Sequence, residues 1–216
     1  AAVRGLGYVG RTEKQAVDRA EQQIKGGDYK EGMQTLRTLP HRFIYASNAS
    51  YLENLANLKQ YASERVAPKP VVLETCKKRL AGLLAADDGW RSVARTDLAD
   101  TIERVPPDAA DALARSVAIG QVLKGLQVAE PATLAAGLIA KAEQRTREGA
   151  ALDASDTACV LQILEWDPTA AGKVVELACP QGQPLEPGLD AVRAWAAAGA
   201  AYGPALSAAI VHVADR

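Results

Sequence analysis

The chain offers few side chains from which a catalytic centre could be built. Its two histidines are His41, in "LPHRFIY", and His212, in the apolar run "AIVHVAD". A serine or cysteine nucleophile needs a neighbouring base of this kind to take its proton, and no G-x-S-x-G motif occurs that would present such a nucleophile. We therefore expect no catalytic residue and no enzymatic activity, and we expect His212 to be half-buried or part of an interface.

Carboxylates with helical spacing occur in "DLAD", where Asp97 and Asp100 would lie near one helix face with Glu103 in reach. A hard cation such as Ca²⁺ takes six to eight oxygen ligands, so we expect an acidic surface turn here. The segment "ADDGW" (86–90) begins like a calcium loop but lacks the alternating acidic residues and the closing glutamate. We expect no metal site and no cofactor.

The cysteines are Cys76, Cys159 and Cys179. An odd number at wide spacing predicts neither a disulfide framework nor a zinc site. We expect buried thiols in a protein of a reducing compartment.

A glycine motif stands near the start of the sequence, where "GLGYVG" (5–10) fits G-x-G-x-x-G. That motif binds a dinucleotide only when it follows a strand and opens a helix, and four residues precede Gly5. We instead expect residues 1–11 to form an extended arm that lies on a neighbour.

The composition indicates an all-α protein. The 216 residues include 43 alanines, and only 5% are aromatic. Alanine favours helices and lets them approach closely. The net charge of −1 divides unevenly, with 11 Lys and Arg against 7 Asp and Glu in residues 1–69 and 14 against 19 in 70–216. The first third could face an acidic partner, although solvated helix faces explain so small a difference equally well. No run reaches 18 uncharged apolar residues, so we expect no membrane span.

The first part of the chain predicts three helices, over 12–25, 28–39 and 48–67. Thr12 with Gln15 forms a capping box, and Gly26-Gly27 ends the first helix. The first two helices resemble a tetratricopeptide-like hairpin. "APKP" (67–70) is the expected linker because its prolines favour an extended connection. After it we expect a helix over 71–86, a turn over 87–90 and a short helix over 95–105.

A proline rhythm marks the second half. Pro131, Pro168 and Pro204 are 37 and 36 residues apart, and proline at the first helical position sacrifices no hydrogen bond. Each proline opens one helix-like segment and follows another, so that a helical hairpin recurs about three times. One hairpin cannot bury both its faces, whereas stacked hairpins share a continuous core. We therefore expect an N-terminal helical region (12–67) followed by an α-solenoid-like array of helical hairpins (71–216), with a compact bundle as the alternative.

The segment "QVLKGLQVAEPATLAAGLIAKAEQRTREGAALDASDTACVLQIL" (121–164) resembles the helical hairpins of organellar octotricopeptide and FAST-kinase-like proteins. In those repeats a Leu-rich motif opens each unit, and "LDASDTACVLQILEW" (152–166) occupies that place here. The likeness extends over residues 108–216 and implies an organellar protein that binds RNA or serves in a large complex. Residues 106–216 depart from such RNA binders because they hold 8 basic against 13 acidic residues, whereas phosphate contacts supply most non-specific RNA affinity.

The best candidate contact surface lies within residues 37–61, where aromatic and basic side chains alternate. Its members are Arg37, Arg42, Phe43, Tyr45, Tyr51, Lys59 and Tyr61. Core packing would explain most of these aromatics equally well.

Together these patterns predict a non-catalytic structural or accessory subunit of a larger multiprotein assembly. Its expected partners are other protein subunits, and its expected location is organellar, with the mitochondrion ahead of the chloroplast. The alternative is an RNA-binding helical-repeat protein, such as a component of the mitochondrial ribosome or of RNA processing.

Overall fold

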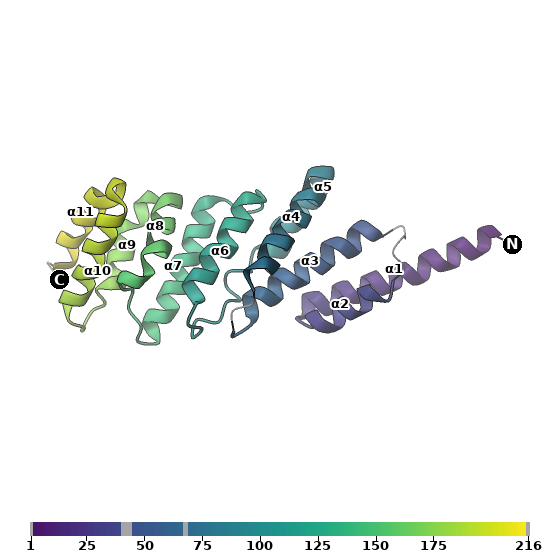
Figure 1. Ribbon diagram of the computed structural model, residues 1–216, viewed down its shortest axis with the longest axis horizontal. Coiled ribbons are helices and arrows are strands. Elements are labelled where there is room, and N and C mark those ends of the chain that lie inside the picture. Colours follow the sequence, from purple (N-terminus) through teal and green to yellow (C-terminus); the bar gives the residue numbers. More distant parts are fainter. Residues whose placement is uncertain (1, 40–44, 67–68, 215–216) are drawn as a thin grey trace. The chain divides into compact units, whose positions relative to one another are not determined.

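The computed structural model describes the backbone of residues 2–39, 45–66 and 69–214, and the side chains from residue 12 to residue 211 within those ranges. This part of the chain forms eleven α-helices and no β-strand (Figure 1). The predicted all-α class is therefore confirmed. The helices fall into two compact units, of which unit 1 comprises residues 1–64 and 68–98 and unit 2 comprises residues 65–67 and 99–216.

Unit 1 contains the first five helices. These are α1 (Ala2–Gly26), α2 (Tyr29–Arg37), α3 (Ala46–Ser63), α4 (Pro70–Ala86) and α5 (Asp88–Leu98). Helix α1 packs on α2 and α3, and α3 also packs on α2, α4 and α5. The core of unit 1 therefore forms around α3, whose Leu55 and Leu58 are fully buried.

A glycine turn joins α1 to α2. Gly27 has φ of +97°, a backbone conformation that glycine adopts without a steric penalty, and it ends α1 where the Gly-Gly pair predicts. Gly32 lets the helices approach, because a Cβ there would stand 2.5 Å from Cγ1 of Ile24. The hairpin thus depends on one glycine for its turn and another for its packing.

Several predicted boundaries in unit 1 are wrong. Residues 2–11 belong to α1 and not to an extended arm, since isolated glycines cost a helix about 1 kcal/mol each without forbidding it. Helix α3 ends at Ser63, because Glu64 is extended with ψ of 141°, and Val66 is 80% exposed.

The expected turn at 87–90 and helix at 95–105 are replaced by a single helix. Helix α5 starts at Asp88, immediately after Asp87, whose Oδ1 accepts a hydrogen bond from the backbone N–H of Gly89 at 2.8 Å. It ends at Leu98, and turns follow up to residue 105. Because α4 and α5 pack on α3, the division between the units falls at residues 98 and 99 and not at "APKP".

Unit 2 contains six α-helices and three short 3₁₀ helices in its described part. They are α6 (Ala112–Gly125), α7 (Pro131–Arg147), η1 (Ala154–Asp156), α8 (Thr157–Trp166), η2 (Pro168–Ala170), α9 (Ala171–Ala178), α10 (Leu185–Ala198), η3 (Ala200–Tyr202) and α11 (Gly203–Ala214). The three regularly spaced prolines stand at or next to helix starts. Pro131 is the first residue of α7, Pro168 is the first residue of η2 just ahead of α9, and Pro204 is the second residue of α11. The six helices predicted in this half are thus present, with starts that shift by a few residues.

Packing in unit 2 links each helix to the next but one. Helices α6, α8 and α10 contact one another in sequence, and so do α7, α9 and α11. The paired helices α6 and α7, and α10 and α11, also pack on each other (Figure 1). Helix α10 also packs on α9, and Gly188 permits their close approach because a Cβ there would stand only 2.4 Å from the carbonyl oxygen of Ala178, the last residue of α9.

A buried lysine connects the turns at 99–105 to α7. Lys141 is 2% exposed, and its Nζ donates to the carbonyl oxygens of Glu103 at 3.0 Å and Val105 at 2.6 Å and to Oε1 of Gln144 at 2.9 Å. These three acceptors match the three donors of an ammonium group. Burial lowers the pKa of Lys141 below its usual 10.5.

Candidate functional site

The candidate site is a cleft of about 680 Å³ within unit 1, between α1, α3 and α5. We call it the Tyr51–Trp90 cleft after the two rings on its wall. Its lining comprises Lys14, Val17, Asp18, Glu21, Tyr45, Ser47, Asn48, Tyr51, Leu52, Asp87, Gly89, Trp90, Val93 and Asp97.

Two aromatic rings form one wall of the cleft. The ring centroids of Tyr51 and Trp90 lie 4.8 Å apart with an interplanar angle of 35°. Tyr51 sits in the second turn of α3 and Trp90 in the first turn of α5, so the contact between α3 and α5 brings the rings together. Tyr45, directly before α3, adds a third ring to the lining.

Asp97 holds the Tyr51 side of this wall in place through a hydrogen bond. The hydroxyl of Tyr51 donates to Oδ2 of Asp97 at 3.0 Å, and Nζ of Lys25 lies 3.7 Å from Oδ1 of the same carboxylate, whose side chain is 11% exposed. Burial, followed by the negative charge of Asp97, raises the pKa of Tyr51 well above 10. The phenol therefore stays neutral and serves as a hydrogen-bond donor, and its hydroxyl is held in one orientation.

Acidic side chains predominate around the opening. Lys14 pairs with Asp18 at 2.6 Å and Lys25 pairs with Glu21 at 2.7 Å, both four residues apart on α1. Asp87 contributes a further exposed carboxylate.

Among the described residues, the lining of the cleft thus holds the carboxylates of Asp18, Glu21, Asp87 and Asp97 together with Lys14, and Lys25 lies beside Glu21 and Asp97. The hydrogen bonds to Asp18 and Glu21 are the main cause that raises the pKa of each lysine. Unit 1 as a whole holds 15 Lys and Arg against 11 Asp and Glu, so the acidic excess is local to the cleft.

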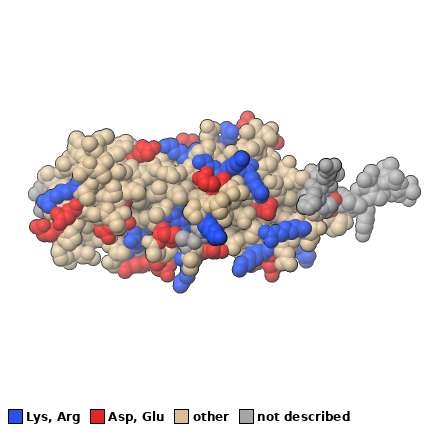
Figure 2. Space-filling view, in the orientation of Figure 1, with Lys and Arg blue, Asp and Glu red and all other residues tan. Residues whose placement is uncertain are grey.

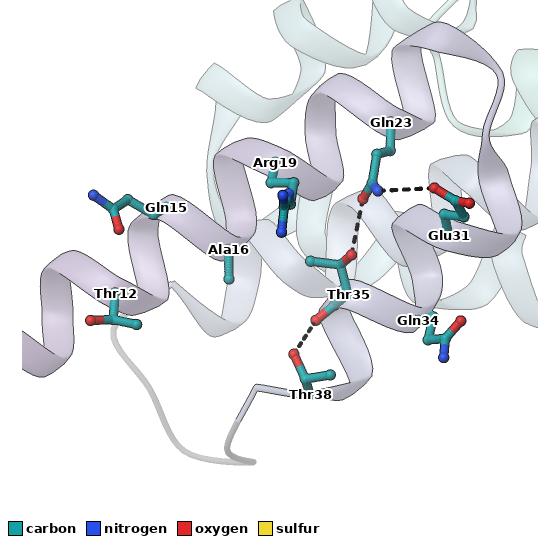
Figure 3. Close-up of a pocket in the computed structure, with 9 residues that line it drawn as sticks. All are labelled: Thr12, Gln15, Ala16, Arg19, Gln23, Glu31, Gln34, Thr35 and Thr38. Atoms are coloured by element: carbon teal, nitrogen blue, oxygen red, sulfur yellow. Dashed lines mark hydrogen bonds between the residues drawn. The ribbon is translucent and has the colours of Figure 1, made fainter.

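A second groove of about 640 Å³ runs between α1 and α2 (Figure 3). Three of its polar side chains bond to one another, because Gln23 accepts from the hydroxyl of Thr35 at 2.9 Å and donates to Glu31 at 3.3 Å. Arg19 projects from α1 towards α2 in the same groove. None of the described residues that line it is aromatic, so these residues offer fewer specific contacts for a ligand than those of the Tyr51–Trp90 cleft.

Unit 2 has a smaller hollow of about 460 Å³ over α6 and α8. Nζ of Lys124 lies 5.7 Å from the ring centroid of Trp166 and 3.1 Å from Oε1 of Glu165. Nε2 of Gln121 donates to Gln162 at 2.8 Å. These contacts join α6 to α8 and use the polar groups of the hollow for packing within the unit.

The three cysteines are buried and free, as the sequence predicts. Burial raises the pKa of Cys76 to about 11 and that of Cys159 to about 12, and it also raises the pKa of Cys179. The thiolate is the nucleophilic and metal-binding form of cysteine, and burial disfavours it at each position. In the part of the chain that the structure describes, no three His, Cys, Asp or Glu side chains are grouped so as to hold a metal ion.

The structure assembles only part of the predicted contact surface. Tyr45 and Tyr51 line the cleft, and Arg37 is exposed in the last turn of α2. Lys59 and Tyr61 are each 7% exposed, so they belong to the interior of unit 1. Arg42 and Phe43 lie outside the described residues, as does the side chain of His212.

Sequence reasoning did not join Trp90 and Asp97 to this site. It placed Trp90 in a turn over 87–90 and Asp97 in an acidic surface turn, whereas both residues belong to α5 and the side chain of Asp97 is 11% exposed. A signal was available, since Trp90, Ala94 and Leu98 follow one another at helical spacing, with Ala94 and Leu98 buried.

Comparisons with protein-family models, with curated proteins and with solved structures each found no match. Among the described residues, no single helix is both long and apolar enough to cross a membrane. Two consecutive segments, Leu185–Ala198 and Ala200–Val211, are together long and apolar enough for a membrane span, by length and composition only, but they are bent by 118° at the break between them.

Proposed function

We propose that this protein is a non-catalytic structural or accessory subunit of a larger multiprotein assembly and acts through protein–protein contacts. The observation that supports the proposal is the packing of unit 2, where α6, α8 and α10 contact one another in sequence and so do α7, α9 and α11. Contacts of this kind are expected when helical pairs stack into an α-solenoid, which presents a long surface to partners.

The chemistry of the buried groups supports this reading. The thiols are held in their neutral form, and the buried Lys141 uses its donors on backbone and side-chain oxygens of its own unit. Charged groups of this kind maintain the fold. The half-buried ring of Trp90 and the exposed carboxylate of Asp87 line the Tyr51–Trp90 cleft, which is suited to contact with another molecule.

Charge favours a protein partner over RNA. Unit 2 holds 10 Lys and Arg against 15 Asp and Glu, and Figure 2 shows both signs interspersed on the face in view. A nucleic-acid-binding surface usually gathers basic residues on one face or along one stripe. The organellar location belongs to the same proposal and is supported by the octotricopeptide-like pattern of residues 121–164.

Gradient fractionation of a lysate from the source organism tests this proposal. The tagged protein should sediment with a large complex, co-purify with defined protein subunits and remain in place after ribonuclease treatment. Sedimentation as a free monomer would refute the proposal. Release by ribonuclease, together with RNA retention that falls steeply with salt, would establish the RNA-binding alternative.

A further inference from the structure

We infer that the Tyr51–Trp90 cleft is the docking site for an arginine side chain on a peptide segment of a partner protein. This inference rests on the proposed function, because it names the partner chemistry through which unit 1 would contact a neighbouring subunit.

Charge complementarity identifies the occupant as a cation. Among the described residues, the carboxylates of Asp18, Glu21, Asp87 and Asp97 outnumber the two lysines near them, although unit 1 as a whole has more basic than acidic residues. The excess negative charge therefore belongs to the cleft itself. A phosphate or an acidic peptide would meet repulsion there, whereas a guanidinium or ammonium group would be attracted.

The aromatic wall selects arginine among cations. Trp90 is half-buried and lines the cleft beside Tyr51, whose ring lies 4.8 Å away. A guanidinium group stacks on such a ring through its flat face and still directs its N–H donors sideways to carboxylates. Ammonium is a compact, strongly hydrated charge and gains less from the same wall.

Asp87 is placed to accept from that guanidinium. It caps the end of α4, its Oδ1 accepts from the N–H of Gly89 at 2.8 Å, and its side chain remains exposed beside Trp90. Asp97 is deeper and already holds Tyr51 and Lys25, so it fixes the wall while Asp87 faces the incoming group. We therefore assign the outer contact to Asp87 and the orienting role to Asp97.

The size of the cleft indicates a peptide segment and not a lone ion. A volume of about 680 Å³ lies within the range of about 300–1,000 Å³ typical of ligand pockets. Val93 in the lining is 44% exposed and provides apolar contact beside the charged positions. An arginine with a small apolar neighbour fits this lining.

Peptide titration of the full-length chain, followed by NMR, tests the inference. The probe is a capped eight-residue alanine peptide with one central arginine, and the matched probes replace that arginine with citrulline, lysine or glutamate. The indole N–H signal of Trp90 is assigned by its loss in Trp90→Phe. The arginine peptide should shift this signal in a saturable way, the lysine peptide should bind several-fold more weakly, and the citrulline and glutamate peptides should leave the signal unchanged.

Two variants locate the contact. Asp87→Asn keeps the oxygen that accepts from Gly89 and removes only the charge, so affinity should fall about two- to fivefold, the range for one exposed ion pair. Trp90→Leu, followed on the amide signals of neighbouring residues, should weaken binding by a similar factor through loss of the cation–π contact. The matched control Glu74→Gln removes an exposed carboxylate on α4 that does not line the cleft, and it should leave affinity unchanged.

Equal shifts from the arginine and citrulline peptides, or no shift at the solubility limit, would overturn the inference. Equal losses of affinity in Asp87→Asn and Glu74→Gln would also overturn it, because they would indicate non-specific attraction. The proposed function fails separately, if the chain sediments alone. If the protein sediments with a complex but does not bind the arginine peptide, the proposed function stands and the arginine docking site is excluded.

Discussion

Gly120 of α6 lies directly against the six-membered ring of Trp166 on α8. A Cβ built on Gly120 would stand 2.7 Å from Cη2 and 2.9 Å from Cζ3 of that ring, closer than real Cβ contacts allow. The ring is held on its other sides because Trp166 is 6% exposed. The contact between α6 and α8 therefore depends on the absence of a side chain at position 120.

Gly120→Ala should lower the free energy of unfolding by about 1–3 kcal/mol, the usual range for overpacking a core. The matched control is Gly172→Ala in α9, where a Cβ would meet nothing within 4 Å. That change should leave stability unchanged or raise it by up to about 1 kcal/mol through helix propensity. Urea unfolding followed by circular dichroism measures both, and equal stability of the two variants would contradict the packing described here.

Lys141→Met should destabilise unit 2 by about 1–3 kcal/mol, because the carbonyl oxygens of Glu103 and Val105 would lose their donor inside the protein. The control is Lys173→Met, which removes an ion pair to Glu143 at 2.9 Å from a lysine that is 46% exposed. An exposed pair contributes at most about 1 kcal/mol. Chemical denaturation of the two variants should show the larger loss at position 141.

Cys159 should make stability depend on alkaline pH. Its pKa is raised by burial from 9.0 to about 12, so the folded protein keeps a proton that the unfolded chain loses. The contribution to stability is therefore fully present below pH 9 and declines as the pH rises from 9 towards 12, by at most about 1.4 kcal/mol per pH unit.

The measurement compares the wild type with Cys159→Ala by denaturant unfolding at pH 8, 9 and 10. The difference in unfolding free energy should shrink steadily above pH 9. A difference that stays constant across this range would show that the thiol ionises as easily in the folded protein as in the unfolded chain.

Tyr51→Phe should cost about 0.5–1.5 kcal/mol, the usual contribution of one hydrogen bond, since Asp97 would lose the donor that lies 3.0 Å away. The raised pKa of Tyr51 adds stability that is present below pH 10 and is lost above it. The variant should therefore lose less stability than the wild type between pH 10 and 11. Tyr202→Phe, in η3 of unit 2, is the control and should match the wild type.

Periodicity in the sequence predicts the helices of unit 2 well. Proline fixes its own backbone angle and lacks an N–H donor, so the positions of Pro131, Pro168 and Pro204 mark helix starts without reference to tertiary contacts. The end of α1 is predictable for a similar local reason, because Gly27 adopts a positive φ.

Other features depend on contacts between distant residues. Whether "DDGW" turns or begins a helix is decided by the packing of Ala94 and Leu98 and by the capping role of Asp87. Lys59 and Tyr61 look like surface residues by type and are buried by the neighbours of α3. The candidate site could be predicted only in part for the same reason, since Tyr51 lies in an evident helical region with Tyr45 just before it, whereas Trp90 and Asp97 are about 40 residues further on.

The lysine at position 141 also decides where unit 2 can be shortened. Residues 99–105 resemble a dispensable connection, yet two of their backbone oxygens are ligands of an enclosed ammonium group. In a shortened protein that begins at residue 106, the buried ammonium group of Lys141 would lack those two acceptors. Lys141 would then have to lose its proton, or water would have to enter and hydrate the charge. The segment before Pro106 is therefore part of the interior of unit 2, and a fragment that keeps Lys141 paired must include Glu103 and Val105.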